Sequence, residues 1–242
     1  MLIELHAHVI YGVDDGPQSR EEMFQMLYAA QNSGVTRLFC TSHISPGEAE
    51  FPLTVYRKHF QEAQEWCAEN APDLRIYPGT EILYTRQTAS MLDGGSIPTL
   101  NGTRLVLVEF LPGDSLRHIN DALVQLCGGG WQVILAHAER YRALNSLKAL
   151  AELKDNFGML VQVNSKSVFD EQAGFFFRRR MRKLLDSGLV DFVSSDAHNT
   201  SGRSFCLQYA WRFLQKEYGE GTANQLCGGN FARIARKIEE KD

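Results

Sequence analysis

Residues 2–8 read LIELHAH, a short apolar run that ends in two histidines. Such a run is typical of a buried β-strand. His6 and His8 are separated by one residue, so on a strand their side chains point to the same side and can bind one metal ion. The H-x-H pattern alone fits two packed histidines equally well, but its place at the end of a strand favours a metal site.

Six further apolar runs of the same kind follow, and five of these also carry a candidate ligand among their last residues. The predicted strands are 2–8, 37–43, 75–82, 104–110, 132–139, 160–165 and 191–198. Between them lie segments with helix punctuation. Ser19 and Glu22 form a capping box ahead of a helix that ends at Gly34, and another helix ends near Gly188. The other predicted helices cover 54–70, 115–127, 143–156 and 202–218.

The regular alternation of strand and helix predicts parallel strands joined by right-handed crossovers. A chain of 242 residues fits one barrel better than two domains. We therefore expect an α/β fold, a distorted (β/α)7 TIM-like barrel, with residues 1–242 forming a single domain. In such barrels the loops after the strands form the reactive face.

Histidines and carboxylates at the predicted strand ends form a candidate metal site. Imidazole and carboxylate ligands together suit zinc, manganese or iron. So many ligands exceed what one ion needs, which indicates a cluster of ions. The candidates are His6, His8, Asp14, His43, Glu81, Glu109, His137, Asp196 and His198.

Several of the polar residues have an alternative interpretation. A buried carboxylate such as Glu81 is costly unless it is paired or coordinated, so it is a natural bridge between ions; an internal salt bridge is the alternative. Asp14 and Asp15 lie in a turn-like loop, and only one of them need be a ligand. His59 and His118 fall in predicted helices, and we interpret them as surface or packing residues.

Two arginines close to candidate ligands indicate a phosphate site. Arg140 follows His137 by three positions, and Arg203 follows His198 by five. Three divalent ions would bring about +6 of charge against about −5 from carboxylates and a hydroxide, which leaves a pocket that attracts a phosphate dianion. A guanidinium binds phosphate oxygens in a bidentate manner. For both arginines a surface ion pair is the alternative.

The composition excludes several classes of protein. The net charge is −4 and no basic stripe is interleaved with aromatic residues, so nucleic-acid binding has no support. No apolar run approaches the ~20 residues of a membrane span and no signal-peptide pattern is present, so we expect a cytoplasmic protein without membrane insertion. Five cysteines without C-x-x-C spacing indicate reduced thiols. We interpret the basic run 178–183 as a solvated helical face, with a docking patch for an acidic partner as the alternative.

Cys206 and Arg212 have the C-x5-R spacing of cysteine-dependent tyrosine phosphatases. The five intervening residues are bulky, free of glycine and helix-like, so they cannot easily wrap an anion. No neighbouring residue is of a type that would lower the pKa of the Cys206 thiol. A mechanism through a thiolate is therefore disfavoured.

Eight motifs in a fixed order and spacing give a specific match to a known family. They are LHAH (5–8), VDDGPQS (13–19), TSH (41–43), GTEI (79–82), VEF (108–110), AHAERY (136–141), QVNS (162–165) and SSDAHN (194–199). In these motifs, and over nearly its whole length, the chain resembles the PHP (polymerase and histidinol phosphatase) superfamily. Within it, the chain resembles the bacterial metal-dependent protein-tyrosine phosphatases of the CpsB/YwqE type.

This resemblance implies a barrel of the PHP type with three divalent metal ions, manganese as the first choice and iron or zinc as alternatives. Arg140 and Arg203 would be the catalytic residues that bind the phosphate. The implied ligands are His6, His8, Glu81 and Asp196 for one ion, Glu81, Glu109 and His137 for a second, and Asp14, His43 and His198 for a third.

The resemblance also implies a substrate, the tyrosine-phosphorylated C-terminal tail of a bacterial tyrosine kinase that controls capsule and exopolysaccharide synthesis. Hydrolysis would use water activated by the ions and no phosphocysteine. This chain has Thr-Ser-His-Ile where relatives often have Thr-Pro-His-His, and the segment 45–51 also differs from theirs. The peptide preference at the rim of the site therefore stays open.

Three other functions remain as alternatives. A PHP phosphatase for a small metabolite such as histidinol phosphate would share the core of the site. A metal amidohydrolase also begins with H-x-H on a barrel, but it commonly uses a lysine on a middle strand, where this chain has Glu109. A regulatory binding module without catalysis would be expected to lack part of the ligand set.

Overall fold

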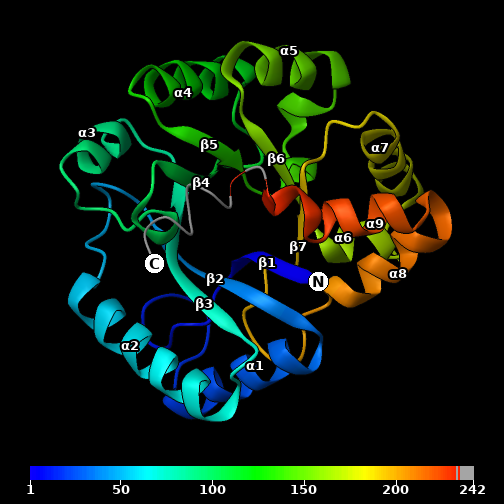
Figure 1. The fold of residues 1–242 in the computed structure, drawn as a ribbon. Coiled ribbons are helices and arrows are strands. Elements are labelled where there is room, and N and C mark those ends of the chain that lie inside the picture. The colour runs from blue at the N-terminus through cyan, green and yellow to red at the C-terminus, as the bar shows by residue number, and fades with distance from the viewer. Residues whose placement is uncertain (233, 235–242) are drawn as a thin grey trace.

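The computed structural model describes residues 1–232 and 234. Seven parallel strands follow one another in sequence order around a nearly closed barrel (Figure 1). They are β1 (Leu2–Ala7), β2 (Val35–Ile44), β3 (Arg75–Leu83), β4 (Leu105–Glu109), β5 (Gln132–Leu135), β6 (Leu160–Asn164) and β7 (Phe192–Ser194). A parallel bridge between Ala7 and Ala197 brings the chain after β7 beside β1. The predicted distorted (β/α)7 barrel is confirmed.

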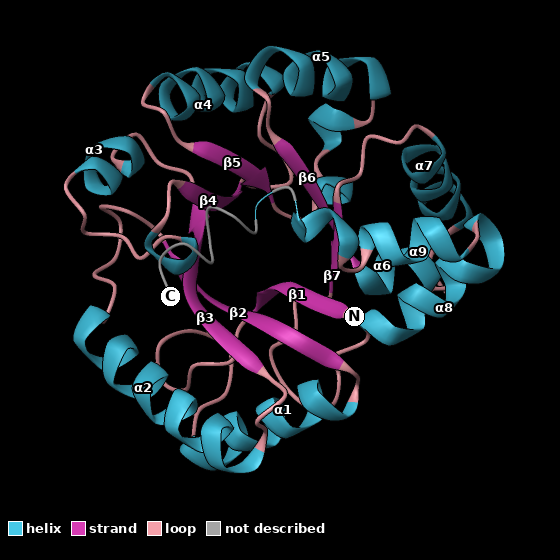
Figure 2. Cartoon of the chain, viewed as in Figure 1, coloured by secondary structure: helices cyan, strands magenta, loops and turns pink. Residues whose placement is uncertain are grey.

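Helices surround the strands on the outside of the barrel (Figure 2). They are α1 (Arg20–Asn32), α2 (Leu53–Asn70), α3 (Thr88–Asp93), α4 (Leu116–Gly128), α5 (Leu147–Phe157), α6 (Ser165–Phe169), α7 (Phe175–Asp186), α8 (Leu207–Tyr218) and α9 (Glu220–Leu226), with short 3-10 turns η1 (Leu100–Gly102), η2 (Ala138–Arg140), η3 (Arg142–Leu144) and η4 (Gly229–Phe231). Within the described residues, no helix combines the length and apolar character needed to cross a membrane.

Two predicted strands end earlier than expected, and both ends lie at candidate ligands. Residue 139 was the expected end of the fifth strand, but β5 ends at Leu135, since His137 has a left-handed backbone with φ of 31°. The seventh run was expected to reach His198, but β7 ends at Ser194, and Asp196 has φ of 55°. Residues other than glycine avoid this region unless the surrounding structure holds them there, and such strain gathers at functional sites.

Two predicted helices begin later than expected. The helix expected over 143–156 is divided, because η3 comes first and α5 begins only after Ser146, whose hydroxyl accepts the Ala149 N–H at 3.4 Å. The helix expected over 202–218 begins at Leu207, and the residues before it form a loop over the end of the barrel. The predicted start at Ser19 is confirmed, since its hydroxyl accepts the Glu22 N–H at 3.2 Å.

Apolar side chains fill the centre of the barrel, so the site can lie only at one end of it. Ile3 and Leu5 of β1 pack there with Phe39, Tyr77 and residues from the other strands, as in the filled interior of TIM barrels. The pairing of β1 with β2 shifts register between Glu4 and Ala7, and Ala7 packs in the outer cluster under α1 and α2. Irregular pairing of this kind re-aims side chains at a barrel rim.

Candidate metal centre

The barrel brings the predicted histidines and carboxylates together at the carboxyl ends of its strands. They form three groups in which the potential ligand atoms all lie within 4.8 Å of one another. The groups are His6, His8, Glu81 and Asp196; His43, Glu81 and Glu109; and His8, Asp15, His43 and His198. Their shared members make one continuous cluster.

Glu81 lies at the centre of this cluster and is fully buried. Its Oε2 lies 3.0 Å from His6 Nε2, 3.1 Å from His8 Nε2 and 3.2 Å from His43 Nδ1. Its Oε1 lies 2.8 Å from His137 Nε2. Burial would raise the pKa of Glu81, but the imidazoles, His6 foremost, bring it well below the ordinary value. The carboxylate is therefore ionised and contacts the ring nitrogens of four histidines from three segments.

The geometry around Glu81 fits a metal site better than a salt bridge. Among the residues that the structure describes, none donates a hydrogen bond to Oε2, although three ring nitrogens lie within 3.2 Å of it. Ligands that surround one ion at about 2.0–2.2 Å stand about 3.0–3.4 Å apart. His6 Nε2 lies 3.2 Å from His8 Nε2 and 3.4 Å from Asp196 Oδ1, so these separations match a shared cation.

The charges of the cluster also favour the binding of cations. Burial would lower the pKa of His137, but Glu109 and Glu81 raise it to about 9. Carboxylates in this cluster thus bind positive charge strongly, whether it comes from protons or from metal ions. The pKa of His198 is lowered to about 4 by burial and by the nearby His8, so its ring is neutral and ready to be a ligand.

His137 is held in its strained conformation by groups that the sequence does not reveal. Its Nε2 lies 3.2 Å from Glu109 Oε2, while the Tyr141 hydroxyl contacts its Nδ1 at 3.1 Å. Its backbone N–H donates to Gln162 Oε1 at 2.8 Å. Partners of this kind orient the ring of a metal-binding histidine and set which nitrogen faces the metal.

Of the two neighbouring aspartates, Asp15 joins the histidines. Its Oδ1 lies 3.2 Å from His198 Nε2 and 3.5 Å from His43 Nε2. His198 Nε2 is a second buried atom for which the described residues supply no hydrogen bond. These atoms have the arrangement expected of a third ion site at the more open side of the cluster.

Asp14, the predicted ligand, contacts His8 and two backbone N–H groups. Its Oδ2 lies 2.8 Å from His8 Nδ1 and accepts the backbone N–H of His43 at 2.9 Å, and its Oδ1 accepts that of Gly16 at 3.0 Å. Burial would raise the pKa of Asp14, but the His8 contact and these N–H groups lower it to about 2. Asp14 thus lies against His8, while Asp15 offers a ligand atom to the group with His43 and His198. The assignment of Asp14 as a metal ligand stays a prediction.

Arg140 and Arg203 lie over the open side of the cluster. Arg140 Nη2 lies 3.1 Å from Asp196 Oδ2, and Arg203 Nη2 lies 3.2 Å from Asp196 Oδ1. Arg203 also contacts Asp15 Oδ2 through Nη1 at 3.1 Å. Their side chains are 44% and 42% exposed, so both arginines join the buried carboxylate of Asp196 to solvent. Neither is an ordinary surface ion pair.

A cleft of about 590 Å³ opens beside these arginines. Its walls come from α6, the loop before α8 and the start of α7, and its lining includes Asn164, Lys166, Phe169, Phe177 and Tyr209. A second hollow, about 390 Å³, opens on the other side, where the segment 45–51 borders Asp15 and His43. The cluster therefore lies in the floor of a surface depression.

Two further interpretations of the sequence are settled by the structure. His59 is a packing residue, as predicted, because its ring stacks on Tyr11 with 3.6 Å between centroids. The interpretation of 178–183 as a solvated face is wrong for Arg180. This guanidinium is half-buried, donates to the Tyr141 carbonyl at 2.9 Å and contacts the Glu139 carbonyl, so it supports the η2 segment that carries Arg140.

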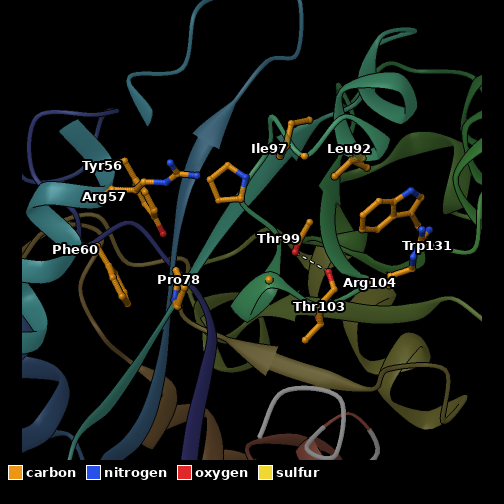
Figure 3. A pocket seen from close by; sticks show the side chains of 13 residues that line it. Tyr56, Arg57, Phe60, Pro78, Leu92, Ile97, Thr99, Thr103, Arg104 and Trp131 are labelled. Atoms are coloured by element: carbon orange, nitrogen blue, oxygen red, sulfur yellow. Dashed lines mark hydrogen bonds between the residues drawn. The ribbon is translucent and has the colours of Figure 1, made fainter. Parts of the chain in front are cut away.

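A separate cavity of about 820 Å³ lies between α2 and the segment that leads into β4 (Figure 3). Figure 3 shows Tyr56 and Phe60 on one side of it and Trp131 on the other. Its charged lining residues are Arg57 and Arg104, and it includes no histidine or carboxylate. This cavity is not part of the metal centre.

Comparison with known proteins places this barrel in a family. Residues 2–236 match the family described as capsular polysaccharide synthesis, CpsB/CapC. The chain belongs to the CpsB/CapC family. It is 37% identical over 238 residues to the tyrosine-protein phosphatase CpsB of Streptococcus pneumoniae, covering 96% of this chain and 98% of that protein. It is 28% identical over 222 residues to the tyrosine-protein phosphatase YwqE of Bacillus subtilis, covering 90% and 85%.

Solved structures share the fold. Crystal structures of YwqE from Bacillus subtilis and CpsB from Streptococcus pneumoniae, described as unique metal-dependent tyrosine phosphatases, include a chain that superposes with a TM-score of 0.85, 24% identity and coverage of 100% and 96%. A histidinol phosphate phosphatase from Lactococcus lactis, complexed with zinc, L-histidinol and phosphate, gives 0.56, 16% identity and coverage of 90% and 94%. The PHP-like architecture inferred from the motifs is thus confirmed.

Proposed function

We propose that this CpsB/CapC family member is a metal-dependent protein-tyrosine phosphatase. The observation that carries the proposal is the buried cluster around Glu81, with two arginines, Arg140 and Arg203, between it and the cleft. The names of the relatives as tyrosine-protein phosphatases support the same activity.

The cluster would hold three divalent ions, with manganese as the first choice and iron or zinc as alternatives. The donor set is mixed imidazole and carboxylate, which suits all three metals. The residues for each ion are His6, His8, Glu81 and Asp196; Glu81, Glu109, His137 and His43; and Asp14, His43 and His198, with Asp15 beside them. When bound, the ions would supply a water nucleophile at neutral pH and neutralise charge on the phosphoryl oxygens.

The protein's own groups then position the phosphate. Arg140 and Arg203 would turn from Asp196 to the non-bridging oxygens of the phosphoryl group, where their paired N–H groups match its geometry. The cleft lined by Phe169 and Tyr209 leaves room for an aromatic ring beside them. Because phenol has a pKa of about 10, the tyrosyl oxygen can leave as a phenolate beside these arginines, without a proton from a general acid.

We further propose that the substrate is the tyrosine-phosphorylated C-terminal tail of a bacterial tyrosine kinase, and that its hydrolysis regulates capsule and exopolysaccharide synthesis in the cytoplasm. The family's description as capsular polysaccharide synthesis proteins supports this context. The position of the cluster in the floor of a surface depression supports a protein substrate, because a protruding peptide side chain can reach it.

The second candidate function is hydrolysis of a small metabolite such as histidinol phosphate, and the shared fold with the Lactococcus lactis enzyme favours it. Steady-state kinetics on a phosphotyrosine peptide and on histidinol phosphate separate the two. We expect kcat/KM for the peptide to be higher by at least ~10²-fold, a difference that one well-used recognition contact or more can provide. A higher kcat/KM for histidinol phosphate would reverse the assignment.

A cysteine-dependent mechanism predicts that activity is lost without Cys206, whereas the metal-dependent mechanism predicts that activity is retained. Burial raises the pKa of this thiol to about 11, and Ser165 Oγ lies 3.0 Å from its Sγ. A thiol with a raised pKa is a poor nucleophile, so Cys206→Ser is expected to retain phosphotyrosine hydrolysis within about twofold. The check is turnover of the purified variant at equal metal content. An inactive, folded and metal-loaded variant would contradict the proposed mechanism.

A further inference from the structure

The start of α7 is unusual for a solvent-facing helix. It begins with three phenylalanines, and Phe175 and Phe176 are 65% and 82% exposed. Arginine and lysine dominate the residues that follow, over 178–183. Adjacent exposed aromatic residues next to a basic run are the kind of surface that marks an interaction site.

A hollow of about 390 Å³ lies between α5 and α7. Its floor is apolar and comes mainly from leucines and phenylalanines, while its basic groups are Arg179, Arg180 and Lys183. No aspartate or glutamate lines it. Over the described part of the chain, Arg179 and Lys183 form no ion pair, whereas the neighbouring Arg182 lies 3.9 Å from Glu217. The groove therefore joins apolar surface to positive charge that has no counter-charge.

This α5–α7 groove adjoins the cleft at the metal centre. Phe177 lines both of them, and Arg140 and Asp196 are among the other residues that line the cleft. Figure 1 shows α7 beside α6, whose residues form another wall of the cleft. An extended peptide with its phosphotyrosine in the cleft can thus run over Phe177 into the groove.

We propose that the α5–α7 groove binds an acidic segment of the protein substrate that flanks the phosphotyrosine. An apolar side chain of that segment fills the hollow, and its carboxylates contact Arg179 and Lys183. Charge complementarity identifies the occupant, because the chain has a net charge of −4 and yet presents unpaired basic groups here. The inference rests on the proposed phosphatase activity and adds a determinant of which phosphotyrosine is chosen.

The test compares two phosphotyrosine peptides with the same core and different flanks. One flank contains leucine, aspartate and glutamate, and the other replaces the acidic residues with asparagine and glutamine. The enzyme variants are Arg179→Glu/Lys183→Glu in the groove and, as a control with the same change in charge, Lys58→Glu/Lys216→Glu on α2 and α8. Both control lysines are highly exposed and lie outside the groove. Free O-phosphotyrosine reports the activity of the metal centre itself.

The groove variant is expected to raise KM for the acidic peptide about tenfold and to leave kcat, the neutral peptide and O-phosphotyrosine unchanged. Phe176→Ala is expected to raise KM for the acidic peptide as well and, because the side chain is exposed, to leave the fold intact. Equal KM values for both peptides with the wild-type enzyme would refute docking in the groove, as would an equal loss in the control variant. Failure to hydrolyse O-phosphotyrosine at all would instead refute the proposed function.

Discussion

Replacing Glu81 with glutamine is expected to abolish phosphotyrosine hydrolysis, with a loss of at least ~10³-fold in kcat. Among the described residues, Glu81 is the one carboxylate that contacts His6, His8, His43 and His137 within 3.2 Å. An amide has the same shape, but it carries no charge and presents N–H groups to some of these rings. The ions that share Glu81 would bind more weakly, and the cations that stabilise the transition state would be lost together.

The measurement is kcat and metal content of the same preparation. Glu62→Gln provides the matched control, because Glu62 is a partly buried glutamate of α2 that pairs with Arg20, away from the cluster. The control is expected to keep both its activity and its metal. A Glu81→Gln protein that keeps full metal content and more than a tenth of the wild-type kcat would show that Glu81 is not the carboxylate on which the ions depend.

The second large effect is expected from the two arginines. Arg140→Ala and Arg203→Ala should each lower kcat/KM by about 10- to 100-fold, since hydrogen bonds between charged groups contribute about 1.5–3 kcal/mol each. The decrease in kcat/KM should be larger for Arg203→Ala, because Arg203 contacts Asp15 as well as Asp196. Replacement by lysine should restore part of the loss, because it keeps the charge and gives up the bidentate geometry.

The arginine variants are informative only if the metal centre survives. Metal content and the thermal unfolding midpoint are therefore measured beside kcat/KM, and both should match the wild type. Unchanged kcat/KM in the Arg140→Ala/Arg203→Ala double variant would show that neither arginine binds the phosphate. A loss of metal in step with activity would assign the arginines a supporting role toward Asp196 instead.

The barrel and the types of ligand were predictable because they follow from local sequence. Buried strands give short apolar runs, and parallel strands bring their carboxyl ends to one face. Burial of a polar residue such as Glu81 at the end of such a run costs free energy unless the residue is paired or coordinates a metal ion. This reasoning needs no knowledge of how the runs pack, and all nine predicted residues lie in or against one cluster in the structure.

The remaining features depend on contacts between distant segments. Asp14 and Asp15 are adjacent and chemically identical, and their contacts differ because the backbone N–H of His43, 29 positions further along, donates to Asp14. The supports of His137 come from Tyr141 and from Gln162, in another strand. Its left-handed backbone has no sequence signature, because a histidine adopts that region only where the surrounding contacts hold it there.

The central claim is that the histidine–carboxylate cluster binds several divalent ions and that turnover needs them. Elemental analysis of the pure protein, combined with a phosphotyrosine-peptide assay before and after chelation, tests it most directly. We predict about three ions per chain, loss of activity when the chelator removes them, and recovery when manganese is returned. A protein that is free of metal and still hydrolyses the peptide at the full rate would contradict the account.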